Sequence, residues 1–309
     1  MIKKIFNKLT RAVKRNLSSK KRECFSDDFS RTVHSHFSDV SQKIVDFIDY
    51  RFIENQSLKE LEKTALMMGP ALRRILGYDA LDLFVKTSKS VAIDSPDHIY
   101  PHGTRQDNSK NLKFNNKLLE WIPIETLKLL DIGCSGGGFV KTFHDVGALA
   151  VGIEGSDYSK NRARAEWKTI PHRLFTADAT APFSIYDQHD NLTLFNIITA
   201  WEFIEHIKED DLAGVFDNID RHLSVNGIVI MSVSPTDHIV NGINLHQTVK
   251  PYEWWIERIG QLGFVHYPAA VRHFSPDHWV RYEENAPASF HIVLTRKGDQ
   301  LPVLQSALH

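Results

Sequence analysis

Cysteine is almost absent from this chain of 309 residues, which contains only Cys24 and Cys134. The two lie far apart in sequence and form neither a metal-type nor a redox-type pair. The composition therefore excludes a disulfide framework and favours a reducing compartment. We predict a cytoplasmic protein.

Long apolar runs are also missing. No stretch approaches the ~20 apolar residues that a membrane-spanning helix needs. Near the N-terminus, basic residues interrupt what would have to be the apolar region of a signal peptide. The sequence thus predicts neither a spanning helix nor a secretion signal.

Acidic residues are lacking at the start of the chain. Residues 1–22 hold nine Lys or Arg and no Asp or Glu, so the rest of the chain is net acidic at an overall charge of −1. Apolar residues recur there at helical spacing, which predicts a basic amphipathic helix. Two interpretations stay open: a tail that is solvated or packs on its own protein, or peripheral contact with the anionic inner face of a membrane. Because the remainder is acidic, we expect no DNA partner and disfavour RNA.

The chain divides into three predicted parts: a basic tail at 1–25, a helical cap and lid segment at 26–125, and a Rossmann-like domain at 126–309. Within the second part, residues 34–84 have a helical pattern that Gly69-Pro70 is expected to break. The polar stretch at 95–111 is too rich in Pro, Gly, Asn and Asp for regular structure. Its length makes it a candidate lid.

The third part alternates short apolar runs with helical segments, as βαβ units do. This rhythm predicts an α/β fold with a doubly wound, seven-stranded, mostly parallel sheet, preceded by an N-terminal helical extension. The strands are expected at 127–132, 149–153, 173–177, 195–200, 228–233, 264–267 and 290–295.

A glycine-rich turn follows the first of these strands, in LLDIGCSGGGFV. Such a turn lets backbone N–H groups at a helix start approach an anionic ligand. A dinucleotide fingerprint needs a glycine where this chain has Ser135, because backbone must approach the pyrophosphate there. S-adenosylmethionine has no pyrophosphate, so its carboxylate and ammonium suit the turn better.

The segment Asp131-x-Gly133-x-Ser135-x-Gly137 resembles the first motif of class I methyltransferases, with Ser replacing one glycine. The resemblance extends over roughly 127–295. It implies that Glu154, after the second strand, binds both ribose hydroxyls of S-adenosylmethionine, as an acceptor-only carboxylate can. It also implies an adenine contact for Asp178. The remaining candidate cofactor residues are Ala179, Trp201 and Arg105, whose guanidinium could pair with the cofactor carboxylate.

The catalytic candidates follow the fourth strand, in the sequence EFIEHI. If a helix starts here, Glu202, Glu205 and His206 share one face, and His246 from a later turn can join them. The set resembles the magnesium site of small-RNA 2′-O-methyltransferases and a similar ExxEH in ubiquinone-biosynthesis O-methyltransferases. Two interpretations stay open: a Mg²⁺ or Mn²⁺ site made by these four residues, or metal-free catalysis with His206 or His246 as general base and Glu202 beside it.

A looser resemblance predicts the class of the methyl acceptor. The stretches HGTRQDNSKN, EFIEHI and LHQTVKPYEWW are similar to methyltransferases of glycan and natural-product biosynthesis. We therefore expect O-methylation of a hydroxyl on a glycan or small molecule. The alternatives are a metal-dependent RNA ribose 2′-O-methyltransferase and a membrane-attached protein that holds the cofactor without turnover.

Overall fold

The computed structural model describes residues 56–274 and 288–301, with the side chains of 56–65 left out. The predicted basic helix at 1–22 therefore lies outside the described residues. By its internal contacts the chain divides into two units, 1–64 and 65–309. The predicted boundaries at 25 and 125 stay predictions. Within the described ranges, no helix is both long and apolar enough to cross a membrane.

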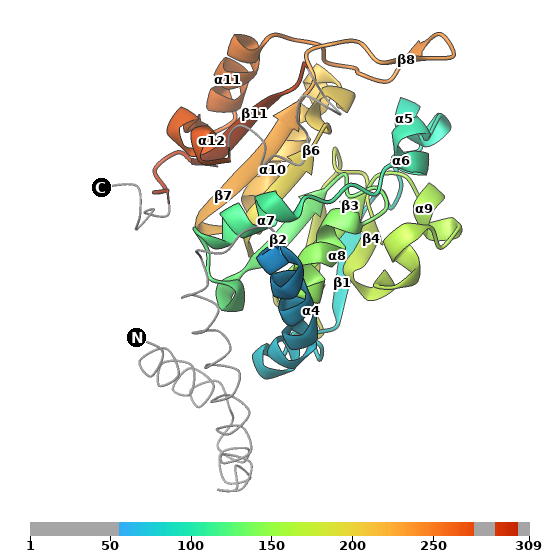
Figure 1. Ribbon diagram of the computed structural model, residues 1–309. Coiled ribbons are helices and arrows are strands. Elements are labelled where there is room, and N and C mark those ends of the chain that lie inside the picture. The colour runs from blue at the N-terminus through green and yellow to red at the C-terminus, as the bar shows by residue number, and fades with distance from the viewer. Residues whose placement is uncertain (1–55, 275–287, 302–309) are drawn as a thin grey trace, which may run out of the picture. The chain divides into compact units, whose positions relative to one another are not determined.

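A seven-stranded sheet forms the centre of the second unit (Figure 1). All seven predicted strands are present, within a few residues of the expected bounds. Only β11 runs antiparallel to its neighbours. This confirms the predicted mostly parallel, doubly wound sheet. In spatial order the strands are β10 (Phe264–His266), β11 (Phe290–Arg296), β7 (Leu223–Val233), β6 (Phe195–Trp201), β2 (Lys128–Ile132), β3 (Leu149–Glu154) and β4 (Leu174–Thr176).

Helices cover both faces of this sheet, because side chains of successive strand residues point to opposite sides. Leu129 belongs to one buried apolar cluster and Leu130 to the other. The first cluster contains residues of α7 (Leu112–Leu119), α8 (Gly138–Asp145) and α12 (Pro268–Phe274), and the second contains residues of α10 (Leu212–His222) and α11 (Tyr252–Gln261). The short helices are α9 (Tyr158–Asn161), η1 (Ile124–Thr126), η2 (Ala165–Lys168), η3 (Pro171–Arg173) and η5 (Glu209–Asp211).

The expected helix break at Gly69-Pro70 is wrong. Helix α4 (Gln56–Leu76) continues through both residues. A Cβ on Gly69 would lie 1.7 Å from the carbonyl oxygen of Asp145, at the end of α8. The glycine is therefore explained by close helix packing rather than by a turn.

The periodicity predicts helix up to residue 84, but the segment after α4 is not wholly helical. Residues Leu83–Thr87 form strand β1, which pairs antiparallel with β5 (Phe183–Asp187) in a separate two-stranded sheet. The polar stretch that follows contains two short helices, α5 (Pro96–Ile99) and α6 (His102–Gln106), so the expectation of irregular structure there is also wrong. Ser95 caps α5 by accepting a hydrogen bond from the backbone N–H of Asp97.

Candidate functional site

A cavity of about 540 Å³ lies beyond the carboxyl ends of the central strands. This is where ligands of open α/β sheets bind. One side is formed by the strand ends and their turns, and the other by residues 89–107, named here the lid segment. Six of the predicted cofactor residues line the cavity: Gly133, Ser135, Glu154, Asp178, Ala179 and Trp201.

The glycine-rich turn after β2 is built from left-handed backbone. Gly133, Ser135 and Gly137 have φ of +78°, +48° and +83°. Only Ser135 carries a side chain in this conformation, which costs roughly 1 kcal/mol. Its hydroxyl donates to the carbonyl oxygen of Asp107 at 3.1 Å and accepts from Arg164 at 3.2 Å. The serine that breaks the glycine pattern thus ties the turn to the lid segment.

Glu154, at the end of β3, is buried and accepts hydrogen bonds from the backbone of two turns. Its two carboxylate oxygens accept from the backbone N–H groups of Ser135 at 2.7 Å and Ser156 at 3.0 Å. Burial raises the pKa of Glu154, and these two hydrogen bonds partly offset that effect. A carboxylate has about four acceptor positions. Glu154 therefore retains capacity for the vicinal hydroxyls of a ribose, and the site fits that part of S-adenosylmethionine.

Asp178, the predicted adenine contact, lies two residues after the end of β4. Its Oδ1 accepts from the backbone N–H and the hydroxyl of Thr180, at 2.9 and 2.6 Å. Its Oδ2 lies 3.7 Å from the ammonium of Lys89. One carboxylate oxygen is thus fixed by the protein, while the other faces a solvent-exposed lysine.

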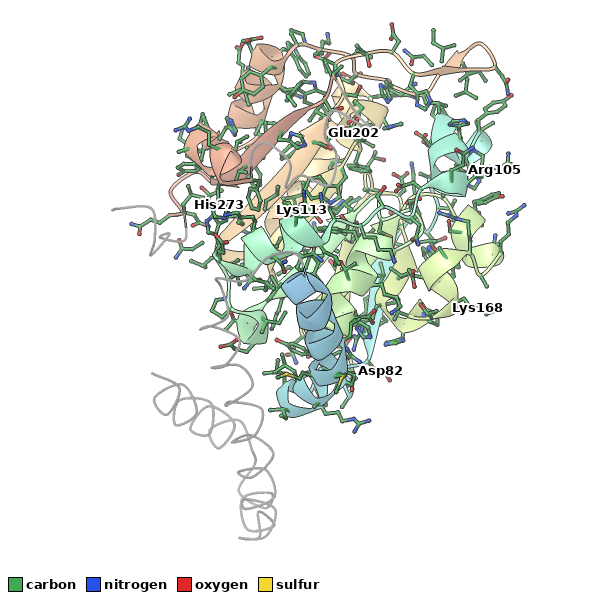
Figure 2. The ribbon with its side chains drawn as sticks, viewed as in Figure 1. Asp82, Arg105, Lys113, Lys168, Glu202 and His273 are labelled. Atoms are coloured by element: carbon green, nitrogen blue, oxygen red, sulfur yellow. The ribbon has the colours of Figure 1, made fainter. Side chains whose placement is uncertain are left out.

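The other three predicted cofactor residues do not line the cavity. Asp131 is buried beneath the turn and accepts from the hydroxyl of Thr199 at 2.7 Å. Gly137 caps α8 in a conformation that few other residues adopt. Arg105, labelled in Figure 2, is exposed on α6. Its guanidinium lies over the ring of Tyr158. The first two shape the turn, and the third lies outside the cavity.

The expected α-helix at Glu202 does not form. Glu202 has φ of +49°, and only the short 3₁₀ turn η4 (Ile204–His206) follows it. The shared helix face is therefore wrong. Glu202 lines the cavity, but one of its oxygens accepts from the hydroxyl of Ser289 at 2.7 Å.

The other three residues of the predicted set meet nevertheless. One ligand atom each from Glu205, His206 and His246 lies within 4.8 Å of the others. The carbonyl oxygen of Glu205 accepts from the backbone N–H groups of Gln247 and Thr248, at 2.7 and 2.9 Å. Backbone pairing between two distant loops thus brings His246 beside η4.

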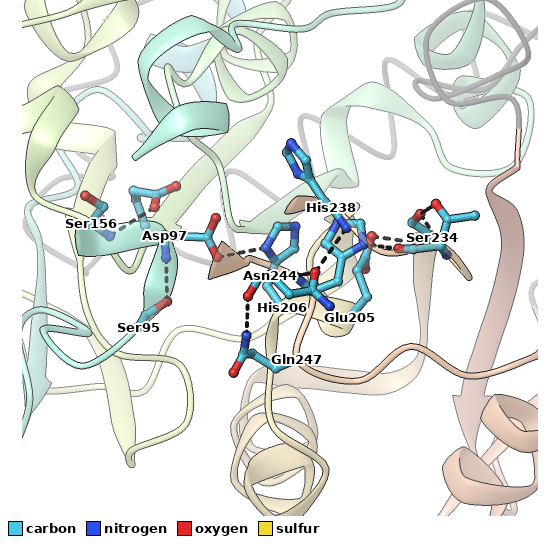
Figure 3. A network of polar contacts seen from close by, with 12 residues as sticks. Ser95, Asp97, Ser156, Glu205, His206, Ser234, His238, Asn244 and Gln247 are labelled. Carbon is cyan, nitrogen blue, oxygen red and sulfur yellow. Dashed lines mark hydrogen bonds and ion pairs between the residues drawn. The ribbon is translucent and has the colours of Figure 1, made fainter. Parts of the chain in front are cut away.

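A hydrogen bond at Nδ1 orients each imidazole, and Figure 3 shows the one between His206 and Asp97. His206 Nδ1–H donates to Asp97 Oδ2 at 2.7 Å, and His246 Nδ1–H donates to the carbonyl oxygen of Thr236. In neutral rings with this pattern, each Nε2 carries a lone pair. Glu205 is fully buried, and among the described residues its Oε2 has no hydrogen-bond partner. The cluster therefore offers two imidazole nitrogens and one carboxylate oxygen.

The pKa of His246 lies far below those of Glu205 and His206. Burial, with a contribution from Glu202, raises the pKa of Glu205 to about 8. Burial lowers the pKa of His206, but the hydrogen bond and charge of Asp97 outweigh this and raise it to about 8. Burial and the charge of His206 lower the pKa of His246 to about 4. Without a bound cation, protons on Glu205 and His206 compensate the clustered carboxylates, whereas His246 stays neutral.

Sequence reasoning missed three groups that build this site: Asp97, Arg164 and His238. Arg164 donates to the carbonyl oxygen of Asp107, and the ring of His238 contacts that of His246 with centroids 5.4 Å apart. The composition of the polar stretch that contains Asp97 predicts a lid, but it does not indicate which side chain faces η4.

Comparison with known proteins agrees with this geometry. The sequence profile of a methyltransferase domain matches residues 102–283, more than half of the chain. The chain belongs to the class I S-adenosylmethionine-dependent methyltransferases. Family membership confirms the predicted resemblance and fold class.

Two curated relatives of this methyltransferase are ubiquinone biosynthesis O-methyltransferases. The one from Bartonella tribocorum is 31% identical over 105 residues, which are 33% of this chain and 39% of the relative. The one from Pelagibacter ubique is 28% identical over 131 residues, 42% of this chain and 47% of the relative. The chain thus spans less than half the length of either relative. A solved S-adenosylmethionine-dependent methyltransferase from Clostridium acetobutylicum is 13% identical, with a TM-score of 0.44 over 64% of this chain and 96% of that one.

Proposed function

We propose that this methyltransferase methylates a hydroxyl oxygen of a small molecule or glycan. The observation that carries the proposal is the cluster of Glu205, His206 and His246 at the cavity. A hydroxyl must lose its proton as it is methylated, and the neutral imidazole of His246 can accept that proton. The two curated relatives, which are named as O-methyltransferases, support oxygen as the acceptor atom.

Each part of the site has a separate task in this proposal. S-adenosylmethionine supplies an electrophilic methyl group. Glu154 and Asp178 hold the nucleoside portion through acceptor oxygens. His246, which stays neutral because of its lowered pKa, takes the hydroxyl proton at Nε2. Catalysis then rests mainly on holding the acceptor oxygen in line with the transferred methyl group.

The test of this proposal is cofactor turnover with a panel of acceptors. Release of S-adenosylhomocysteine with a phenol, polyol or sugar, and with a methyl ether as product, would support it. Product that disappears after ribonuclease treatment would instead favour an RNA ribose acceptor. Tight cofactor binding without turnover on any acceptor would favour a binding protein.

A divalent metal is a second candidate for activating the hydroxyl. The specific observation is Glu205 Oε2, a fully buried carboxylate oxygen without a hydrogen-bond partner among the described residues, close to two imidazoles. One carboxylate and two histidines fit a divalent ion, and the imidazoles shift preference from Mg²⁺ toward Mn²⁺ or Zn²⁺. A bound ion would lower the pKa of the acceptor hydroxyl.

Metal removal tests this candidate directly. Dialysis against EDTA should abolish turnover, and Mn²⁺ or Mg²⁺ should restore it. Elemental analysis of the purified protein should find about one ion per chain. Full turnover in EDTA, with no metal found, would leave His246 as a simple base.

A further inference from the structure

We propose that Asp97, on the lid segment, is the positioning residue that orients His206. This inference rests on the proposed function for its meaning, but its geometry is independent of the acceptor. Asp97 Oδ2 accepts from His206 Nδ1 at 2.7 Å, and the residues are 109 positions apart. Both side chains are largely shielded, with 25% and 18% exposed, so solvent screens this ion pair less than a surface pair.

The lid segment is anchored on the opposite side of the cavity. The backbone N–H of Ala92 donates to the carbonyl oxygen of Gly155 at 2.9 Å, and the backbone N–H of Asp178 donates to the carbonyl oxygen of Lys89 at 2.9 Å. Further along the segment, Arg164 donates to the carbonyl oxygen of Asp107. These contacts reach the turns after β3 and β4, where the predicted cofactor residues lie. Asp97 therefore connects the cofactor side of the cavity to η4.

The capped start of α5 directs the Asp97 side chain across the cavity. Figure 3 shows the Asp97 carboxylate pointing at His206, with Ser95 and Ser156 on the opposite side of Asp97 in this view. A carboxylate on Nδ1 selects the tautomer that leaves Nε2 bare and raises its basicity. That orientation aims Nε2 at the cluster, where it can bind a metal. The lid must be in place for the cluster to have this geometry.

The experiment compares three variants of the full chain. Asp97→Asn keeps the shape of the side chain, and Asp97→Ala removes every partner of Nδ1. The matched control is Asp157→Asn. Asp157 Oδ1 lies 4.0 Å from Nδ1 of His98, which is on the same lid helix as Asp97, and within the described part of the chain no hydrogen bond or ion pair joins Asp157 to His206. A general role of acidic residues in anchoring the lid would be shared by Asp157.

The first readout is histidine nitrogen NMR under alkaline conditions where the rings are neutral, with the His206 signal assigned through His206→Gln. In the wild type and in Asp157→Asn, Nδ1 should carry the proton. In Asp97→Asn the Nε2-protonated tautomer should gain population, because an amide can donate to Nδ1. This readout needs no acceptor, so it stands even if the proposed reaction is wrong.

The second readout is turnover. In Asp97→Asn, kcat should fall about 10–100-fold, as when an outer partner of a ligating histidine is lost. The KM for S-adenosylmethionine should change by less than about twofold, since Asp97 bonds to His206 instead. An unchanged tautomer in Asp97→Asn, or an equal loss of kcat in Asp157→Asn, would overturn the proposal.

Discussion

The two sides of the cavity are built by different means. The cofactor side consists of backbone turns at the ends of parallel strands. Of its key side chains, Glu154 ends β3 and Asp178 lies two residues after β4. The other side, named here the acceptor side after the proposed function, is assembled from short turns and loops, with Asp97 on α5, His206 on η4 and His246 in a later loop. A regular sheet therefore determines the first side, whereas contacts between loops determine the second.

This difference suggests that cofactor binding depends on one side of the cavity and methyl transfer to the acceptor depends on the other. Cofactor residues act on groups that are the same in every methyltransferase of this class, so a rigid framework suits them. The acceptor side must fit one particular substrate, and loops on a rigid scaffold commonly carry such specificity. Mutations on the two sides should therefore have separable effects.

The largest expected effect concerns the acceptor side. His246→Ala should lower turnover by ~10²–10⁴-fold, because it removes the neutral imidazole that takes the proton. Affinity for S-adenosylmethionine, measured by calorimetry, should stay near the wild-type value. If His246→Ala weakens cofactor binding as strongly as it lowers turnover, the two sides of the cavity do not act separately. Gln261→Ala, at the end of α11, is a control for surface substitution.

A buried histidine outside the cavity should affect cofactor binding and turnover equally. His222 accepts from the backbone N–H of Ile185 at 3.1 Å and donates to the carbonyl oxygen of Asn218 at 2.8 Å. Burial lowers its pKa from 6.5 to about 4. As pH falls from 6.5 to 4, the unfolded chain takes up a proton that the folded chain resists, so stability decreases. The loss should reach about 3 kcal/mol at the acidic end.

Urea unfolding across this pH range measures the effect. His222→Gln keeps an acceptor for Ile185 but does not titrate, so its stability should fall less with acid than that of the wild type. Because α10 and β5 support the whole domain, cofactor binding and turnover should decline together. Parallel pH curves for the two proteins would show that His222 does not carry the effect.

The sequence predicted the strands and the glycine-rich turn of the cofactor side because their information is local. An apolar strand, a glycine-rich turn and a carboxylate at the next strand end are each readable within about a dozen residues. Ser135 was recognised as a departure, but its bond to Asp107 required a contact between distant segments. The same limitation explains why Arg105 is a wrong prediction for the cavity lining. Its charge suits the cofactor carboxylate, but its position on α6 places it outside the cavity.

The acceptor side was predicted by residue type but not by geometry. Glu205, His206 and His246 do converge, yet they do so through a 3₁₀ turn and loop pairing rather than along a helix face. Glu202 was included because of the assumed helix, and its left-handed backbone turns it toward Ser289 instead. Asp97 gave no sequence signal because its partner is 109 residues away.

The cofactor side offers the next prediction. Glu154→Ala should weaken S-adenosylmethionine binding by ~1–3 kcal/mol, since it leaves the ribose hydroxyls and two backbone N–H groups without their acceptor. Glu154→Gln retains one acceptor oxygen and should lose less. Calorimetry on both variants measures the effect, and kcat at saturating cofactor should remain. Unchanged affinity in Glu154→Ala would contradict the predicted ribose contact.

The smallest expected effect concerns Ser135, where the two sides are joined. Ser135→Ala removes the hydrogen bonds to Asp107 and Arg164 but keeps a side chain in left-handed backbone, so unfolding should become easier by about 1 kcal/mol. Ser135→Gly loses the same bonds but relieves the backbone strain, which is worth a similar roughly 1 kcal/mol. The glycine variant should therefore be nearly as stable as the wild type. In both variants the lid segment loses a tie to the turn, so cofactor should dissociate faster in stopped-flow measurements. Equal stability of the alanine and glycine variants would show that the backbone at Ser135 is not strained. Unchanged dissociation in both would show that the lid is held by its other contacts alone.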